Sequence, residues 1–132
     1  MLDDNTPIEK AIHTQRSAAD PTSSVWVSAS AGTGKTKVLT DRVLSLLVAG
    51  SEPQKLICLT FTRAAATEMA DRISEQLGKW SMMEDRDLQI DLQILLGKKP
   101  NIGQMLRARQ LLALVLEVPG GMQIETIHAF CQ

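Results

Sequence analysis

This 132-residue sequence has no long apolar runs and no excess of charge of one sign, and it contains only two cysteines. No stretch reaches the roughly 18 apolar residues that a membrane-spanning helix needs, so no transmembrane helix is expected. The 14 basic and 15 acidic residues leave a net charge of −1, which excludes a histone-like or tail-like polyelectrolyte. The two cysteines, Cys58 and Cys131, have no metal-ligand spacing, and we expect both to be reduced.

What is present is typical of a folded globular chain. Apolar residues make up 44% and charged residues 22%, a balance that argues against disorder. The length predicts one domain or slightly less. The acidic start over residues 1–4 lacks the apolar core of a secretory signal, and we expect a cytoplasmic protein. Residues 124–132 carry no polar tail and no glycine or proline stop, so we expect the sequence to be a fragment.

Helix and strand signals alternate along the chain. The expected elements are helices at 6–18, 35–49, 64–80, 85–96 and 102–118 and strands at 25–28, 56–60 and 122–126. Short links between the first strands and helices predict a parallel α/β unit. The strand at 56–60 is apolar almost throughout, which predicts that both of its faces are covered.

A loop of small residues joins the expected strand at 25–28 to the expected helix at 35–49. Small residues let backbone N–H groups approach nucleotide phosphates, and the helix start adds a positive dipole end. Lys35 would reach the β- and γ-phosphates and the Thr36 hydroxyl would bind Mg²⁺. The predicted positions are Ala29, Ser30, Ala31, Gly32, Thr33, Gly34, Lys35 and Thr36. Ala29 replaces the first glycine of the strict motif, and the alternative is a glycine-rich turn that carries a lysine.

A phosphate loop usually works with an acidic residue at the end of another apolar strand. The one candidate is Glu117, which ends the run 111–117. Arg107 and Arg109 precede that run, and leucine and alanine dominate it, so a buried helix is the better interpretation. We therefore assign no catalytic residue.

Four motifs in order resemble the N-terminal motor domain of UvrD/Rep-type superfamily 1 DNA helicases. They are Gln15 within 13–16, the loop 31–36 with its continuation 38–43, the segment 59–69 and the segment 124–131. Residues 25–30, 56–60 and 119–121 are most similar to the AddA subunits of bacterial AddAB helicase–nucleases, of the alphaproteobacterial kind.

The resemblance implies an α/β fold, a partial RecA-like P-loop NTPase domain with a parallel sheet and flanking helices, incomplete at its C-terminus. Residues 1–20 would form an N-terminal helix with the glutamine motif. Residues 21–132 would form part of the first motor domain, with a helical segment at 81–118.

The resemblance also assigns residue roles. Gln15 matches a glutamine that reads the adenine edge, since its amide both donates and accepts. Lys37 follows the phosphate loop and would approach the nucleotide, whereas Arg42 is expected to be packed or paired. The positions that match motifs contacting single-stranded DNA are Thr60, Phe61, Thr62, Arg63, Ala64, Thr126 and His128.

Three of the aromatic and imidazole side chains have simpler interpretations. Phe61 would be an ordinary core residue if it does not meet DNA. His128 would be a helix cap or a core histidine. Phe130 is expected in the core.

The implied function is ATP-driven DNA unwinding in recombinational double-strand-break repair, and the implied partners are ATP, Mg²⁺, DNA and an AddB-like subunit. The Asp-Glu motif, the arginine finger and the second motor domain would all follow Gln132. We therefore expect the chain alone to bind nucleotide weakly and not to unwind DNA. Two alternatives are a stand-alone nucleotide-binding or regulatory module and another P-loop enzyme, such as a small-molecule kinase.

Overall fold

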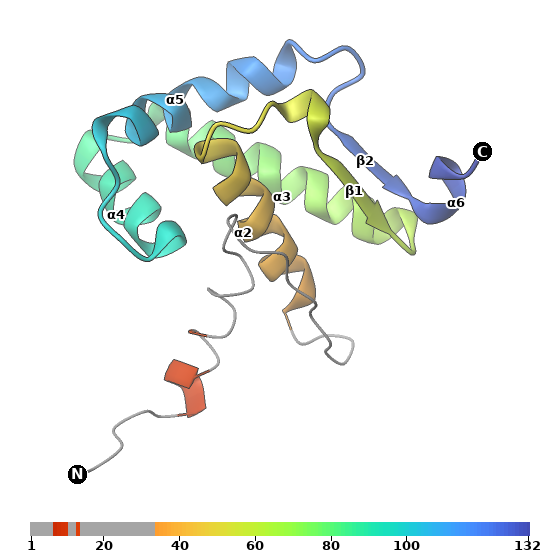
Figure 1. Cartoon of the computed structure of the whole chain (residues 1–132), viewed down its shortest axis with the longest axis horizontal. Coiled ribbons are helices and arrows are strands. Elements are labelled where there is room, and N and C mark those ends of the chain that lie inside the picture. Colours follow the sequence, from red (N-terminus) through yellow and green to blue (C-terminus); the bar gives the residue numbers. More distant parts are fainter. Residues whose placement is uncertain (1–6, 11–12, 14–33) are drawn as a thin grey trace.

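The computed structural model of the chain describes residues 7–10, 13 and 34–132 (Figure 1). Its elements are α2 (Lys35–Val48), the 3-10 helix η1 (Pro53–Lys55), β1 (Ile57–Thr60), α3 (Arg63–Met82), α4 (Asp85–Leu96), α5 (Ile102–Leu116), β2 (Gln123–Thr126) and α6 (Ile127–Phe130). Residues 7–10 and 13 are helical. This order confirms the helices and strands expected beyond residue 34, while the strand at 25–28 lies outside the described residues.

The strands β1 and β2 form a two-stranded parallel sheet within the described part of the chain. Their register pairs Ile57 with Gln123 and Thr60 with Thr126. Parallel neighbours need a crossover connection, and here α3, α4 and α5 supply it. Helix α3 contacts both strands. The structure thus confirms a parallel sheet, while the strand at 25–28, with which the predicted unit begins, lies outside the described residues.

One face of β1 is open, which corrects the expectation that both faces are covered. Side chains alternate between the two faces of a strand. Cys58 packs against the core, whereas Ile57 and Leu59 are 52% and 42% exposed. The residues of β1 are nearly all apolar, but among the described residues only one face of the strand is covered.

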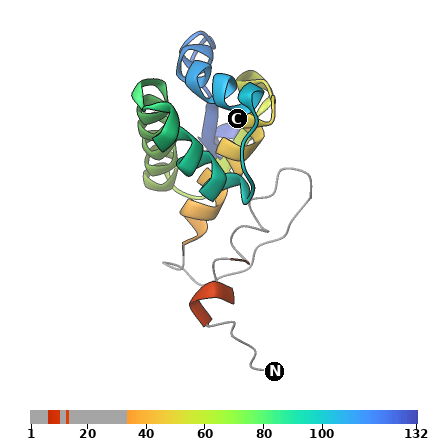
Figure 2. The ribbon, with the colours of Figure 1, turned by 90° about the vertical axis from the view of Figure 1, so that its left-hand side faces the viewer.

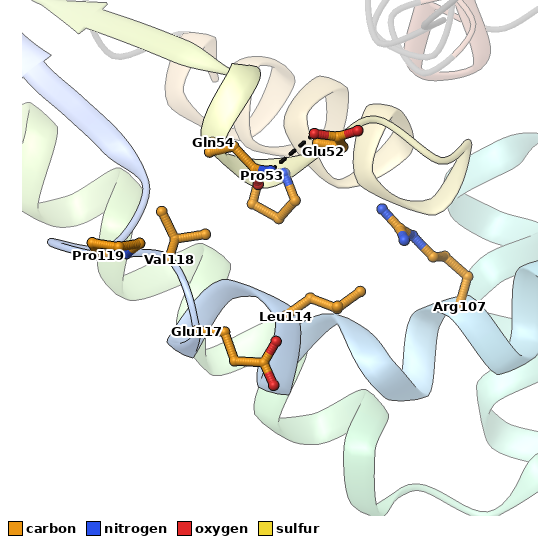
Figure 3. A pocket seen from close by; sticks show the side chains of 8 residues that line it. All are labelled: Glu52, Pro53, Gln54, Arg107, Leu114, Glu117, Val118 and Pro119. Carbon is orange, nitrogen blue, oxygen red and sulfur yellow. Dashed lines mark hydrogen bonds between the residues drawn. The ribbon is translucent and has the colours of Figure 1, made fainter.

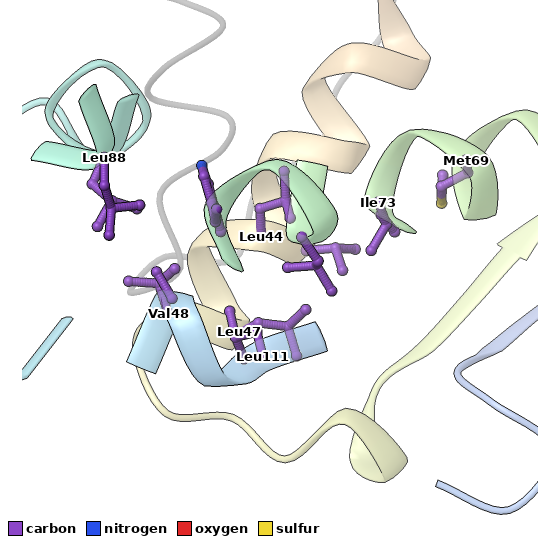
Figure 4. Packing of buried hydrophobic residues seen from close by; sticks show 12 residues of the cluster. Leu44, Leu47, Val48, Met69, Ile73, Leu88 and Leu111 are labelled. Carbon is purple, nitrogen blue, oxygen red and sulfur yellow. The ribbon is translucent and has the colours of Figure 1, made fainter. Parts of the chain in front are cut away.

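The hydrophobic core lies among α2, α3, α4 and α5 (Figures 1, 2 and 4). Helix α3 contributes a stripe of apolar side chains at helical spacing, which is why a 20-residue helix packs along one side only. The fully buried large side chains are Trp80, Leu47, Ile73, Leu77, Leu88, Leu92 and Leu111.

The leucine-rich run that ends at Glu117 belongs to α5, not to a strand. Asn101 begins this helix with a capping box, in which its side chain accepts from Gln104 N while Gln104 Oε1 accepts from Asn101 N. Glu117 caps the other end and is exposed. This confirms the interpretation of a helix, and it removes Glu117 as an acidic residue at a strand end.

Arg107 joins α5 to the end of α2. Its guanidinium donates from Nε to Leu47 O at 3.0 Å and from Nη2 to Ser51 O at 2.9 Å. Leu47 O lies in the last turn of α2 and also accepts from Gly50 N at 3.2 Å, and Ser51 O lies just beyond the end of the helix. The same arginine lines a pocket of about 360 Å³ between η1 and α5 (Figure 3).

Candidate functional site

The described part of the predicted phosphate loop is its last turn, Gly34, Lys35 and Thr36. Gly34 precedes α2 in the left-handed region with φ 85°, a conformation that favours glycine. Lys35 is exposed and Thr36 is half-buried, and the first turn of α2 carries no acidic residue. The positive end of the helix dipole is therefore not neutralised from within that turn. Gln15 and residues 29–33 lie outside the described residues.

The two basic residues further along α2 are engaged with the protein. Lys37 Nζ forms an ion pair with Asp41 Oδ2 at 2.7 Å, one turn along the helix. Arg42 is half-buried and has an interaction partner, in keeping with the expectation that it is packed or paired. The nucleotide role of Lys37 stays a prediction.

The two segments expected to contact DNA end up side by side. In a parallel sheet the carboxyl ends of neighbouring strands meet at one edge, and here β1 ends at Thr60 opposite Thr126, the end of β2. A helix follows each strand almost at once, α3 after β1 and α6 after β2 (Figure 1). We call these two strand ends, with the helix starts that follow, the carboxyl edge.

A threonine caps each of these helices. Thr62 Oγ1 accepts from Ala65 N at 3.1 Å at the start of α3, and Thr126 Oγ1 accepts from Ala129 N at 3.1 Å at the start of α6. A hydroxyl that accepts one bond still has its own proton to donate. Each threonine can therefore cap a helix and donate to a phosphate oxygen at the same time.

Phe61 is the most exposed large apolar side chain in the described part of the chain. It lies between the end of β1 and the cap of α3 and is 91% exposed, so the interpretation of Phe61 as a core residue is wrong. Arg63 and Ala64, in the first turn of α3, are also exposed. An open aromatic ring next to a cation suits a stacked base and its phosphate.

Thr60 differs from its neighbours because it is buried. It is 8% exposed, and its hydroxyl donates to Thr62 O at 2.9 Å. The same oxygen lies 3.5 Å from Glu125 O on β2. The sequence placed Thr60 among the DNA contacts, but its hydroxyl proton is directed to the backbone.

In the segment 124–131, neither His128 nor Phe130 lies in the core. His128 is exposed, which contradicts a core histidine, and Thr126 rather than His128 caps α6. Phe130 is 46% exposed, so its expected place in the core is wrong. The reason is that α6 has four residues packed against strand ends, and its outer side is uncovered among the described residues.

Cys58 lies on β1, two residues before Thr60. Burial raises the pKa of the Cys58 thiol, so this thiol stays protonated at neutral pH. Both cysteines are free, Cys58 half-buried and Cys131 exposed. No group of three histidine, cysteine or acidic side chains is placed to hold a metal within the described ranges.

The site also includes an atom that residue types do not reveal. Glu125 contributes its backbone carbonyl near Thr60, and any residue at that position would offer the same atom.

No helix in the described ranges combines the length and apolar character needed to cross a bilayer.

The chain is similar to known helicase–nuclease proteins. A family model described as the UvrD/REP helicase N-terminal domain matches residues 11–132. A relative from Latilactobacillus sakei is 40% identical over 107 residues, covering 81% of this chain and 10% of that protein. A relative from Clostridium kluyveri (strain NBRC 12016) is 39% identical over 106 residues, covering 77% and 8%. Both are named as subunits of an ATP-dependent helicase/nuclease.

A third relative of the same name, from Pediococcus pentosaceus, is 35% identical over 108 residues, covering 81% of this chain and 7% of that protein. The chain thus spans a tenth or less of the length of these curated relatives. No solved structure matches it. None of these three relatives supports the alphaproteobacterial detail, which stays a prediction.

Proposed function

Because the chain belongs to the family of UvrD/REP helicase N-terminal domains, we propose that it forms the ATP-binding and DNA-contacting part of a helicase motor. Residues 21–132 would be part of the first, RecA-like motor domain, with residues 1–20 carrying the glutamine motif. The names of the relatives favour a whole protein of the AddA helicase–nuclease type.

The nucleotide would bind at the start of α2. Residues 29–36 would surround the phosphates with backbone N–H groups, Lys35 would neutralise phosphate charge, and Gln15 would read the adenine edge. The Thr36 hydroxyl would be one ligand of Mg²⁺, which supplies charge neutralisation at the phosphates when bound. The left-handed Gly34 and the exposed Lys35 support this arrangement.

The DNA strand would lie on the carboxyl edge. Thr62 and Thr126 would donate their hydroxyl protons to backbone phosphates, Phe61 would stack on a base, and Arg63 and His128 would add polar contacts. The observation that carries the proposal is the register of the sheet, which aligns the end of β1 with the end of β2. Two motifs far apart in sequence thereby end side by side at the same edge of the sheet.

The larger activity would belong to the longer protein. In it, ATP-driven movement along single-stranded DNA would serve double-strand-break repair in the cytoplasm together with an AddB-like partner. The 132-residue chain alone is expected to bind Mg-ATP weakly and to leave duplex DNA unopened.

The test separates the two binding surfaces. Mg-ATP affinity is measured by calorimetry and oligothymidylate affinity by fluorescence anisotropy, on the wild-type chain and on Lys35→Ala, Arg63→Ala and Lys98→Ala. Lys35→Ala should weaken ATP binding about tenfold or more and leave DNA binding nearly intact, and Arg63→Ala should do the reverse. Lys98, exposed beyond the end of α4, is the matched control. A wild-type chain that binds neither ligand would contradict the proposal.

A further inference from the structure

The bend between β1 and α3 is held by a buried hydrogen bond. Thr60 donates from its hydroxyl to Thr62 O at 2.9 Å, across the two-residue step that contains Phe61. Thr62 O also accepts from Ala66 N at 3.2 Å, so the carbonyl that starts α3 has two donors. Hydrogen bonds thus fix both ends of the bend, whereas Phe61 at its tip is 91% exposed.

Thr60 also lies at the junction of the two strands. Its hydroxyl oxygen is 3.5 Å from Glu125 O, the carbonyl that precedes Thr126. The register places Thr60 directly opposite Thr126. One buried side chain therefore touches the backbone of both segments that form the carboxyl edge.

We propose that Thr60 is a positioning residue for single-stranded DNA, which fixes the bend that presents Phe61 and holds it beside the end of β2. The inference rests on the proposed function, because it concerns the same edge. It differs from a direct contact, since a side chain that is 8% exposed has little surface to offer a nucleic acid. The hydroxyl acts through the backbone, and DNA meets Phe61 and Thr62.

Preorganisation is the physical reason for an effect on affinity. A free bend would sample several orientations of the Phe61 ring, and selecting one of them on binding would cost free energy. A buried hydrogen bond contributes about 1 kcal/mol net, which corresponds to about fivefold in a binding constant. Removing it should therefore weaken DNA binding by about that factor without removing any group that touches DNA.

The experiment uses anisotropy titrations of a fluorescein-labelled oligothymidylate with the full 132-residue chain. The variants are Thr60→Val, which keeps the shape and loses the hydroxyl, and Thr60→Ser, which keeps the hydroxyl. Thr40→Val is the matched control, because Thr40 is also buried and its hydroxyl has no hydrogen-bond partner among the described residues. Thermal melts confirm that each variant folds.

We expect Thr60→Val to lose about fivefold in affinity, with Thr60→Ser and Thr40→Val close to wild type. In a Phe61→Ala background, which itself should cost about tenfold, Thr60→Val should add clearly less than its fivefold loss in the wild-type background. Unchanged binding by Thr60→Val, an equal loss in Thr60→Ser, or a full additional loss without Phe61 would each overturn the inference. Absence of binding by the wild-type chain would instead overturn the proposed function.

Discussion

At the scale of single residues, four threonines show that the backbone position of a hydroxyl decides what it does. Thr62 and Thr126 are helix caps with a proton left to donate. Thr60 donates its proton to the backbone, and the hydroxyl of Thr40 has no hydrogen-bond partner in the part of the chain that the structure describes. Because the same side chain has three different surroundings, its chemistry depends on where the backbone places it.

The cap of α3 gives the first residue-scale prediction. Thr62→Ala removes the acceptor for Ala65 N and should lower the free energy of unfolding by about 1 kcal/mol. Urea denaturation followed by circular dichroism measures the change. Thr67→Ala is the matched control, since Thr67 is exposed within α3 and alanine suits that position better. A Thr62→Ala variant as stable as wild type would show that the cap contributes nothing.

Sequence alone predicted Thr60, Thr62 and Thr126 as DNA contacts but could not tell Thr60 from Thr62. Both residues are threonines in the same motif, so neither residue type nor motif spacing distinguishes them. The difference comes from the alternation of β1, which buries Thr60, and from the bend after it, which leaves Phe61 in solvent. Gly34 was within reach of sequence reasoning, because a left-handed turn before a helix favours glycine.

At the scale of elements, the helices were the most predictable part. Both α4 and α5 begin where expected, since 12 and 15 residues of helical periodicity with clear flanking turns leave little ambiguity. The sequence predicted the short strand β1 but not its open face. An apolar run looks the same in a sequence whether one face of the strand is covered or both. Coverage depends on the other elements, not on the strand.

The contact between α5 and the end of α2 gives a prediction at this scale. Arg107→Met keeps the aliphatic stem but removes both donors to Leu47 O and Ser51 O. We expect a loss of about 2 kcal/mol in the free energy of unfolding, because two hydrogen bonds from a charged donor are lost. Arg86→Met on the exposed side of α4 is the control and should change stability little. Equal urea midpoints for the two variants would contradict this role.

At the scale of the whole molecule, the parallel pairing of β1 and β2 connects fold and function. Alternating strands and helices predicted a parallel sheet, and four motifs predicted the family that the comparison confirms. The register could not be predicted, because it follows from the packing of the helices that connect the strands. The nucleotide-binding roles of residues 15 and 29–37 stay a prediction, and residues 15 and 29–33 lie outside the described ranges.

The buried thiol of Cys58 gives a prediction for the whole molecule. Burial raises its pKa above the ordinary value of 9.0, so the unfolded chain releases this proton at a lower pH than the folded chain. Stability is therefore fully present below about pH 9 and falls as pH rises from there toward the folded pKa, by at most about 1.4 kcal/mol per pH unit. The sequence has no tyrosine, so no phenol titrates in this range.

Urea denaturation between about pH 8 and pH 10, below the ordinary lysine pKa, under reducing conditions measures the slope. Cys58→Ala should flatten the slope, whatever it does to the absolute stability. Cys131→Ala replaces an exposed thiol and should leave the slope in place. The same decline in all three proteins would place the titrating group elsewhere. A slope confined to the chains that keep Cys58 would show that β1 stays packed on the core until the fold as a whole is lost.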